Sequence, residues 1–170
     1  MNDTRKTTFK GNPLTLIGPE LTPGDPAPGF TVVDADHKTV SLADFQGRPM
    51  IINSILSVET GICSAQTRRF NEEAANLPPA VAILTISMDL PFGQKRFCDA
   101  EGIDRVQVLS DHRDASFGSA FGTLVKETRW LSRALFVVDA RGVVRYAEYL
   151  PEIGTHPNYD AALDAIRALV

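Results

Sequence analysis

The thiols of two cysteines, Cys63 and Cys98, are the strongest candidate nucleophiles of this chain. Cys63 ends the segment TGIC at 60–63, between an apolar run and a stretch with helical spacing. A helix start offers the sulfur free N–H groups and the positive end of the helix dipole, and both favour the reactive thiolate. The loop position also predicts some access for solvent and substrate. From this fragment alone, a small buried cysteine with Thr60 as a plain helix cap remains an open alternative.

Cys98 falls within a second stretch that is predicted to be helical. It can form an intrachain disulfide with Cys63 only where the two Cα atoms come within about 7 Å of each other. If the folded helix holds the two residues farther apart, the helix must partly unwind before the bond forms. The chemistry would then depend on a conformational change. The alternative is an inert core cysteine.

Two polar side chains could assist a thiolate at position 63. The hydroxyl of Thr60 can cap the helix and also hydrogen-bond the sulfur. Arg133 precedes the apolar run 135–138, and an arginine at a strand mouth can place a permanent positive charge beside a thiolate and orient a substrate oxygen. The alternative for Arg133 is a surface charge that ends a strand.

The surrounding pattern predicts the elements that must position these residues. Short apolar runs at 50–55, 81–87, 135–138 and 143–146 are typical of central strands buried on both faces. Apolar residues at helical spacing predict helices over 63–76 and 159–169, and Pro91 at a helix start predicts another over 92–101. This order predicts an α/β sandwich around a mixed sheet.

The first part of the chain has a different pattern. Segments 8–10 and 14–16 flank the turn signal GNP at 11–13, which predicts an N-terminal β-hairpin. A Pro- and Gly-rich connection at 22–29 leads to expected short strands at 30–33 and 39–42, and 139–142 is expected to be a hairpin loop. Since no repeat or internal linker divides the chain, we expect one domain over residues 1–170.

Composition excludes several function classes. The chain has 170 residues, 44% of them hydrophobic, and a formal net charge of −4. Nucleic acid is therefore an unlikely partner, because phosphate binding requires a cationic face. No apolar run approaches the roughly 18 residues of a membrane span. The polar first residues predict no secretory signal, so a cytoplasmic protein is expected, in which two cysteines indicate catalysis or metal binding rather than a structural disulfide.

Metal binding has little support in the sequence. The three histidines, His37, His112 and His156, lie in separate polar stretches, and neither a CxxC nor an HxxxH spacing occurs. We expect all three to be surface residues. No haem or flavin motif is present, so we expect neither a metal nor an organic cofactor.

Nearly from end to end, the chain resembles the bacterial thiol peroxidases, the atypical two-cysteine subfamily of the peroxiredoxins. The matching segments are FKGNPL at 9–14, TGIC at 60–63, SMDLPFGQKRFC at 87–98, LSRALFVVD at 131–139 and NYDAAL at 158–163. The segment that ends at Cys98 is the most specific of these. The resemblance implies a thioredoxin-like fold with a mixed central sheet flanked by helices.

The resemblance also assigns roles to the candidate residues. It implies that Cys63 is the peroxidatic cysteine and Cys98 the resolving one, joined in an intrachain disulfide after reaction with hydrogen peroxide or an alkyl hydroperoxide. It implies that Thr60 hydrogen-bonds the sulfur and the peroxide, and that Arg133 is the active-site arginine. A thioredoxin-type reductant and a homodimer are implied in the same way.

Two other functions remain open at this level. One is a thiol–disulfide oxidoreductase acting on protein disulfides, against which the missing second cysteine of a CxxC argues. The other is a non-catalytic redox-sensing protein with weakened peroxidase activity. The redox-sensor hypothesis rests on Leu56. This residue stands where peroxiredoxins have the proline of the pattern proline-x-x-x-threonine-x-x-cysteine. Leucine keeps the apolar bulk of proline but frees φ and restores a backbone N–H.

This departure predicts a working site with a looser first turn. The substitution Leu56→Pro is therefore expected to raise the second-order rate constant for reaction with hydroperoxide, measured by stopped-flow on the reduced protein. A rate constant that is unchanged or lower would show that leucine serves at this position at least as well as proline.

Overall fold

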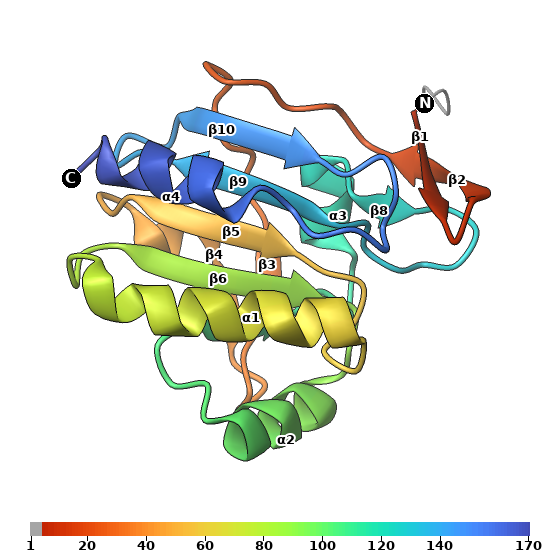
Figure 1. Ribbon diagram of the computed structural model, residues 1–170, viewed down its shortest axis with the longest axis horizontal. Coiled ribbons are helices and arrows are strands. Elements are labelled where there is room, and N and C mark those ends of the chain that lie inside the picture. The colour runs from red at the N-terminus through yellow and green to blue at the C-terminus, as the bar shows by residue number, and fades with distance from the viewer. Residues whose placement is uncertain (1–4) are drawn as a thin grey trace.

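A seven-stranded mixed sheet forms the centre of the computed structural model, which describes residues 5–170 (Figure 1). In spatial order its strands are β10 (Val144–Tyr149), β9 (Ala134–Val138), β5 (Met50–Ser54), β6 (Ala82–Ser87), β7 (Gln107–Ser110), β3 (Thr31–Val33) and β4 (Thr39–Ser41). Strands β5, β6 and β7 run parallel, and the remaining neighbouring pairs are antiparallel. The predicted mixed sheet is confirmed.

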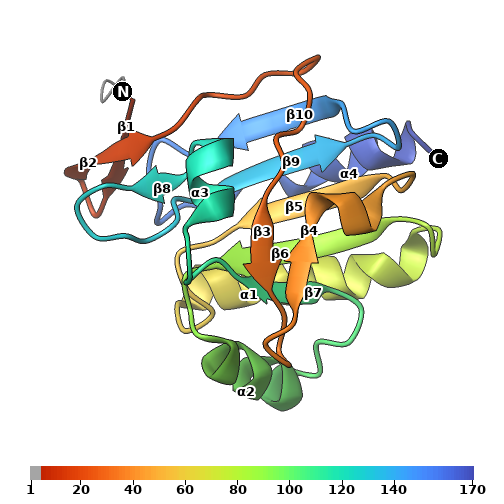
Figure 2. The same ribbon diagram turned by 180° about the vertical axis from the view of Figure 1, so that it is seen from behind.

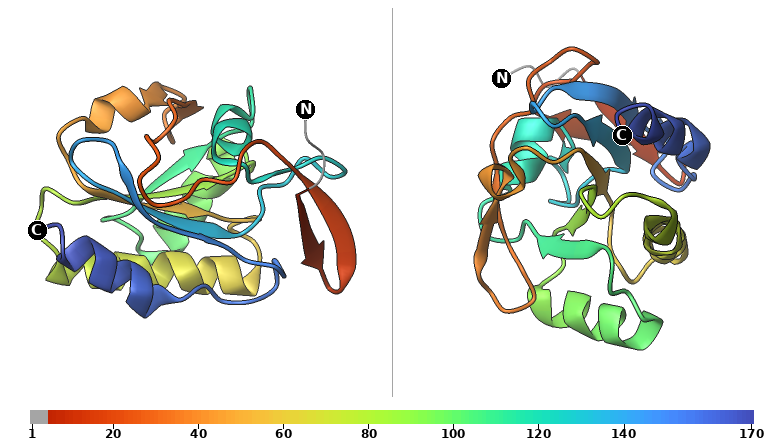
Figure 3. Two further views of the ribbon diagram at one scale, coloured as in Figure 1. Left: turned by 90° about the horizontal axis from the view of Figure 1, so that it is seen from above. Right: turned by 90° about the vertical axis from the view of Figure 1, so that its left-hand side faces the viewer.

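Helices cover both faces of this sheet. Helices α1 (Gly61–Glu73) and α4 (Tyr159–Arg167) lie side by side over one face, and α3 (Ser116–Phe121) lies over the other (Figures 1 and 2). Helix α2 (Pro91–Glu101) stands apart at the β7 side of the sheet (Figure 3). Two short 3₁₀ turns, Leu42–Phe45 and Ala74–Asn76, follow β4 and α1. The expected helices are all present, with ends shifted by a few residues.

The central strands are buried because both of their faces are covered. All residues of β5, β6 and β9 are buried, as the near-continuous apolar runs predicted. The expectation that the run at 143–146 is a central strand is wrong, because β10 lies at the edge of the sheet and only its first residue, Val144, is fully buried. Successive side chains of β5 point to opposite faces, so Ile51 joins the core beneath α1 and α4, and Ile52 joins the core beneath α3. Phe70 of α1 and Ile166 of α4 belong to the first core, and Phe117 of α3 belongs to the second.

The predicted N-terminal hairpin is confirmed, and its turn lies slightly earlier than expected. Strands β1 (Lys6–Phe9) and β2 (Asn12–Ile17) pair antiparallel around Lys10 and Gly11, whose φ angles are +52° and +79°. Two positive φ values suit the turn type that matches the twist of a two-residue hairpin. Strand β8 (Leu124–Val125) pairs with β2, so these three strands form a second small sheet.

Sequence analysis missed three elements, β7, α3 and β8. Strand β7 begins with the exposed Gln107 and has four residues, which is too short for a clear apolar pattern. Helix α3 has six residues and begins after Ala115, a non-glycine residue at φ +50°, so it carries no standard start signal. Strand β8 has two residues and is defined by its partner β2.

Two sequence-based expectations concern location. The expectation of no secretory signal rests on the polar start of the chain, of which residues 1–4 lie outside the described residues. None of the helices within residues 5–170 combines the length and the apolar character needed to cross a membrane.

Asp111 is a buried acid that links β7 to α3. Its carboxylate oxygens accept the backbone N–H groups of Phe117 and Gly118 at 3.0 and 2.8 Å. Burial raises the pKa of Asp111 from 3.8 to about 6, although these hydrogen bonds oppose the shift. Because the folded state then keeps this proton to a higher pH than the unfolded state, the contribution of Asp111 to stability falls as the pH rises from about 4 to about 6.

The substitution Asp111→Asn is expected to remove this pH dependence. A shift of about two pKa units corresponds to about 3 kcal/mol, so the variant should gain about that much stability relative to wild type between pH 4 and pH 7. Urea unfolding of both proteins at several pH values measures the difference. A difference that does not change with pH would show that the carboxyl ionises normally in the folded protein.

Candidate active site

Cys63 lies in the first turn of α1, as predicted. Thr60 is the N-cap residue, with extended φ and ψ of −89° and 147°, and its hydroxyl oxygen accepts the N–H of Cys63 at 3.3 Å. This hydroxyl also donates to the carbonyl of Ser57 at 3.3 Å, so it contacts the backbone of Cys63 rather than the sulfur. The cap therefore fixes the turn that carries the thiol.

The expected solvent access of Cys63 is wrong in this structure. Its exposed fraction is 0%, and its side chain packs in the core that includes Val58, Phe70 and Ile153. The third position of α1 faces the sheet rather than the solvent, which explains the burial. A buried thiolate requires a partner for its charge, because desolvation disfavours the charged form.

Arg133 supplies that partner. Its Nη2 donates to the Sγ of Cys63 at 3.2 Å, its Nη1 to Oε1 of Gln66 at 2.7 Å, and its Nε to the carbonyl of Ile153 at 2.8 Å. The side chain is 2% exposed, so the alternative of a surface charge is wrong. Since Gln66 and the Ile153 carbonyl are uncharged, the sulfur is the group in this set that can balance the guanidinium charge as a thiolate.

Strand pairing explains why Cys63 and Arg133 meet. Strands β5 and β9 are antiparallel neighbours, and Ser54 at the end of β5 pairs with Ala134 at the start of β9. The loop from β5 to α1 therefore leaves the sheet at the same end of the strands at which Arg133 leads into β9. The hydroxyl of Ser54 donates to the carbonyl of Ser132 at 2.8 Å, which ties the two segments together.

Gln66 and Asn53 hold the guanidinium in place, and sequence analysis missed both. The Nε2 of Gln66 donates to Oδ1 of Asn53 at 3.0 Å, and Nδ2 of Asn53 donates to the carbonyl of Leu84 at 3.1 Å. This chain of hydrogen bonds connects β6, β5 and α1 to Arg133. The available signals were a polar Asn53 inside an apolar strand and a glutamine one helical turn after Cys63.

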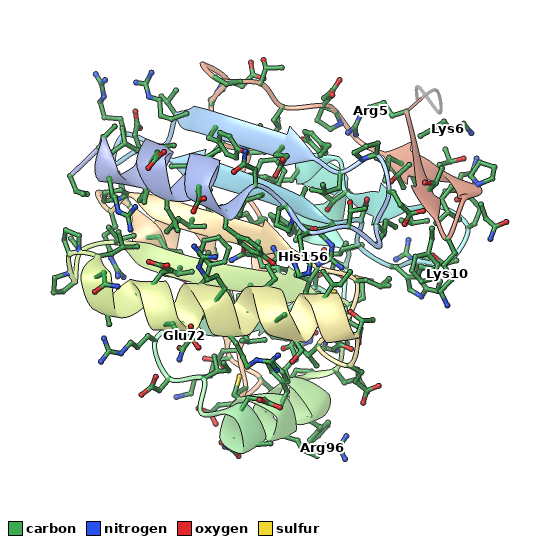
Figure 4. All side chains as sticks on the ribbon, in the orientation of Figure 1. Arg5, Lys6, Lys10, Glu72, Arg96 and His156 are labelled. Carbon is green, nitrogen blue, oxygen red and sulfur yellow. The ribbon has the colours of Figure 1, made fainter. Side chains whose placement is uncertain are left out.

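Tyr159 is a third missed residue near the site. Burial raises the pKa of its hydroxyl, the positive charges of Arg133 and Arg69 oppose that shift, and Cys63 adds to it. The hydroxyl lies 2.8 Å from Nδ1 of His156, which Figure 4 labels near the start of α4. Tyr159 thus brings the beginning of α4 within electrostatic reach of the thiol.

Cys98 lies on α2, as predicted, and both cysteines are free thiols in the structure. Cys98 is half-buried and packs against the same core as Cys63. Burial, together with the negative charge of Asp99, raises the pKa of the Cys98 thiol to about 11, and Lys95 opposes the shift. Folded α2 therefore keeps Cys98 as a protonated, weakly nucleophilic thiol at neutral pH.

An apolar cleft opens beside the first turn of α1. It has a volume of about 400 Å³, and its lining includes Phe9, Leu56, Thr60 and Trp130. The polar residues Ser57, Glu59 and Asp89 also line it. The rings of Phe9 and Trp130 meet edge to face with centroids 5.4 Å apart, so the N-terminal hairpin forms one wall. Leu56, in the position of the family proline, is buried and adds apolar surface to this wall.

The histidines do not gather into a metal site. Within residues 5–170, no group of three His, Cys, Asp or Glu side chains has an arrangement that could hold a metal ion. His37 and His156 are exposed, while His112 is partly buried, with its Nδ1 2.8 Å from the hydroxyl of Ser110.

Comparison with known proteins identifies the family. Residues 22–163 match the family model described as Redoxin. A thiol peroxidase of Bacillus subtilis (strain 168) is 56% identical over 163 residues, which cover 96% of this chain and 97% of that protein. This chain is a redoxin of the thiol peroxidase family. A thiol peroxidase of Listeria innocua is 52% identical over 162 residues, which cover 95% of this chain and 98% of that protein.

Solved structures extend the family comparison to the fold. A peroxiredoxin-like protein from Aquifex aeolicus superposes with a TM-score of 0.91 at 38% identity and covers 98% of both chains. A thiol peroxidase from Chromobacterium violaceum gives a TM-score of 0.86 at 24% identity, again over 98% of both chains, and supports the fold alone. The predicted thioredoxin-like fold of this thiol peroxidase family member is therefore confirmed.

The raised pKa of Cys98 predicts slow alkylation. In a Cys63→Ser variant at pH 8, a two-unit shift lowers the thiolate fraction about 100-fold, while the higher nucleophilicity of the more basic thiolate restores about tenfold. Iodoacetamide should thus modify Cys98 roughly tenfold more slowly than it modifies free cysteine. In urea the two rates should agree, and equal rates in buffer would show that α2 does not bury the thiol.

Proposed function

We propose that this chain reduces hydroperoxides through Cys63, with Cys98 as the resolving thiol and Arg133 as the residue that stabilises the thiolate. The contact of 3.2 Å between Nη2 of Arg133 and Sγ of Cys63 carries this proposal. The activity class, a thiol-dependent peroxidase, follows from the redoxin match and the thiol peroxidases at 56% and 52% identity. The residue roles rest on the geometry and on the family motif.

In the first step, the Cys63 thiolate attacks the terminal oxygen of the hydroperoxide. An S–O bond forms as the O–O bond breaks, Cys63 becomes a sulfenic acid, and the departing alkoxide or hydroxide takes a proton to leave as alcohol or water. Negative charge moves from sulfur to the leaving oxygen in this step. The fixed guanidinium of Arg133 stabilises that charge without having to reorganise, and the Thr60 hydroxyl borders the cleft through which the peroxide enters.

In the second step, the sulfur of Cys98 attacks the sulfenic sulfur of Cys63. An S–S bond forms, the S–O bond breaks, and the hydroxide leaves as water with the proton of the Cys98 thiol. Unwinding of α2 brings the two cysteines together. It also exposes Cys98, so the thiol pKa of about 11 in the folded helix falls toward its ordinary value, and the thiol is activated as it arrives.

In the third step, a dithiol reductant of the thioredoxin type reduces the disulfide by exchange and restores both thiols. We also propose that residues 1–170 form one domain, that the protein is cytoplasmic and that it acts as a homodimer, as its family resemblance implies. A non-catalytic redox sensor is disfavoured, because Leu56 leaves the contact between Arg133 and Cys63 in place. A disulfide oxidoreductase is disfavoured because the second cysteine lies on a separate helix.

Intact mass and free-thiol count after one equivalent of hydroperoxide test the cycle. Wild type should lose both thiols and about 2 Da, Cys98→Ser should gain about 16 Da, and Cys63→Ser should stay unchanged. Two thiols retained in wild type, or only interchain bridges, would overturn the assigned roles.

A further inference from the structure

Asp89 joins the loop before Cys63 to the loop before the helix that carries Cys98. It lies between β6 and α2, and its side chain reaches across to the segment that precedes α1 (elements in Figure 1). Oδ1 accepts the hydroxyl of Ser57 at 2.7 Å, and Oδ2 accepts the N–H of Val58 at 2.9 Å. One carboxylate therefore binds both the side chain and the backbone of this loop.

Asp89 is itself fixed by elements other than α1. Its Oδ2 accepts the hydroxyl of Ser87 at 2.5 Å, and its carbonyl accepts the hydroxyl of Ser110 at 2.5 Å. Gln94 of α2 donates to the hydroxyl oxygen of Ser87 at 3.0 Å and to the carbonyl of Leu109 at 2.8 Å. The ends of β6 and β7 and the first turn of α2 thus hold Asp89 in one orientation.

The contact continues to the reactive cysteine through three hydrogen bonds of 3.2 to 3.3 Å. The Ser57 carbonyl accepts the N–H of Thr60 at 3.2 Å and the Thr60 hydroxyl at 3.3 Å. The Thr60 oxygen in turn accepts the N–H of Cys63 at 3.3 Å. Movement of Ser57 would therefore displace the cap and the turn that hold the sulfur against Arg133.

The hydrogen bonds at this position match a carboxylate. Asp89 accepts three hydrogen bonds with two oxygens, from Ser57, Val58 and Ser87. An asparagine offers one acceptor oxygen and places two N–H donors where another donor already points. The substitution Asp89→Asn therefore removes the acceptor either for the Val58 N–H or for the Ser57 hydroxyl, while it keeps the size of the side chain. In the second case Ser57 stays bonded only by accepting from the amide, through an oxygen that already accepts the N–H of Glu59.

We propose that Asp89 is a positioning residue, which acts through Ser57 and Thr60 to hold Cys63 in the geometry that reacts with peroxide. The inference rests on the proposed role of Cys63. Asp89 does not touch the sulfur, and its effect is to keep the first turn of α1 closed against the sheet edge while substrate binds.

Resolution by Cys98 should depend on Asp89 far less. Within α2 the buried residues are Pro91 and Gln94, both in its first turn, while Cys98 lies further along the helix. The first turn can thus remain attached beside Asp89 while the later part of α2 unwinds. Loss of the Asp89 contacts is expected to slow reaction with peroxide and to leave closure of the disulfide nearly unchanged.

Single-turnover kinetics separate these two steps. Trp130 is the only tryptophan of the chain and shares the cleft with Thr60, so its fluorescence is the probe in stopped-flow, and quenched samples give the disulfide by mass. Asp89→Asn and Ser57→Ala should each lower the second-order rate constant for hydrogen peroxide about tenfold, since each loses a hydrogen bond to the loop. The first-order rate constant of disulfide closure should stay within about twofold.

Matched variants distinguish positioning from loss of fold or change of charge. Ser57→Ala keeps the Asp89 charge, so agreement between the two variants assigns the effect to the hydrogen bond. Ser57→Thr keeps the hydroxyl and should restore the wild-type rate. Glu72→Gln removes an acid from the exposed face of α1, where Figure 4 labels Glu72, and should react like wild type.

Two results would overturn the inference. One is an unchanged or higher peroxide rate in Asp89→Asn and Ser57→Ala, and the other is an equal slowing of both kinetic steps. In either case the proposed function stands if wild type forms the disulfide between Cys63 and Cys98. Wild type that keeps both thiols after hydroperoxide would instead contradict the proposed function.

Discussion

The buried contact between the Arg133 guanidinium and the Cys63 sulfur is the constraint on which the rest of the site depends. A guanidinium that is 2% exposed must have its donors satisfied and its charge balanced, because removal from water is costly for an ion. Gln66 and the Ile153 carbonyl satisfy two arms, and the sulfur receives the third. Among these three partners, the sulfur is the group placed to carry the balancing negative charge.

The same contact links the chemical step to the conformational step of the proposed cycle. When the thiolate becomes a sulfenic acid, the sulfur loses its negative charge and the buried guanidinium loses its counter-charge. The first turn of α1 then keeps its cap, its core packing and the Asp89 contacts, but it loses the ionic contact with Arg133. Oxidation thereby weakens the closed arrangement at the moment when Cys98 must approach.

Much of the fold could be predicted because its signals are local. The apolar runs identified β5, β6 and β9, and helical spacing with Pro91 identified α2. Short elements were missed because a six-residue helix after Ala115 or a two-residue strand carries too little periodicity. These elements are defined by their tertiary partners rather than by their own residues.

The candidate site shows the same division. Cys63, Thr60 and Arg133 were found from residue type, position and family motif, whereas Gln66, Asn53 and Tyr159 were missed. The roles of the missed residues arise from contacts between β5, α1, β9 and α4. These elements are far apart in the sequence, so no short segment predicts such contacts. The solvent access of Cys63 was predicted wrongly for a related reason. A helix start can face either the solvent or the sheet, and the packing of neighbouring elements decides which.

Cys63 and Arg133 are separated by 70 positions, and β9 enters the sheet beside β5. During synthesis the cysteine leaves the ribosome well before the arginine that contacts its sulfur in the folded protein. Until β9 pairs with β5, the nascent chain carries an ordinary thiol with no buried guanidinium beside it. The buried contact between Arg133 and the sulfur therefore forms only with completion of the sheet, and in the proposed cycle the reactivity of Cys63 toward peroxide develops at that stage.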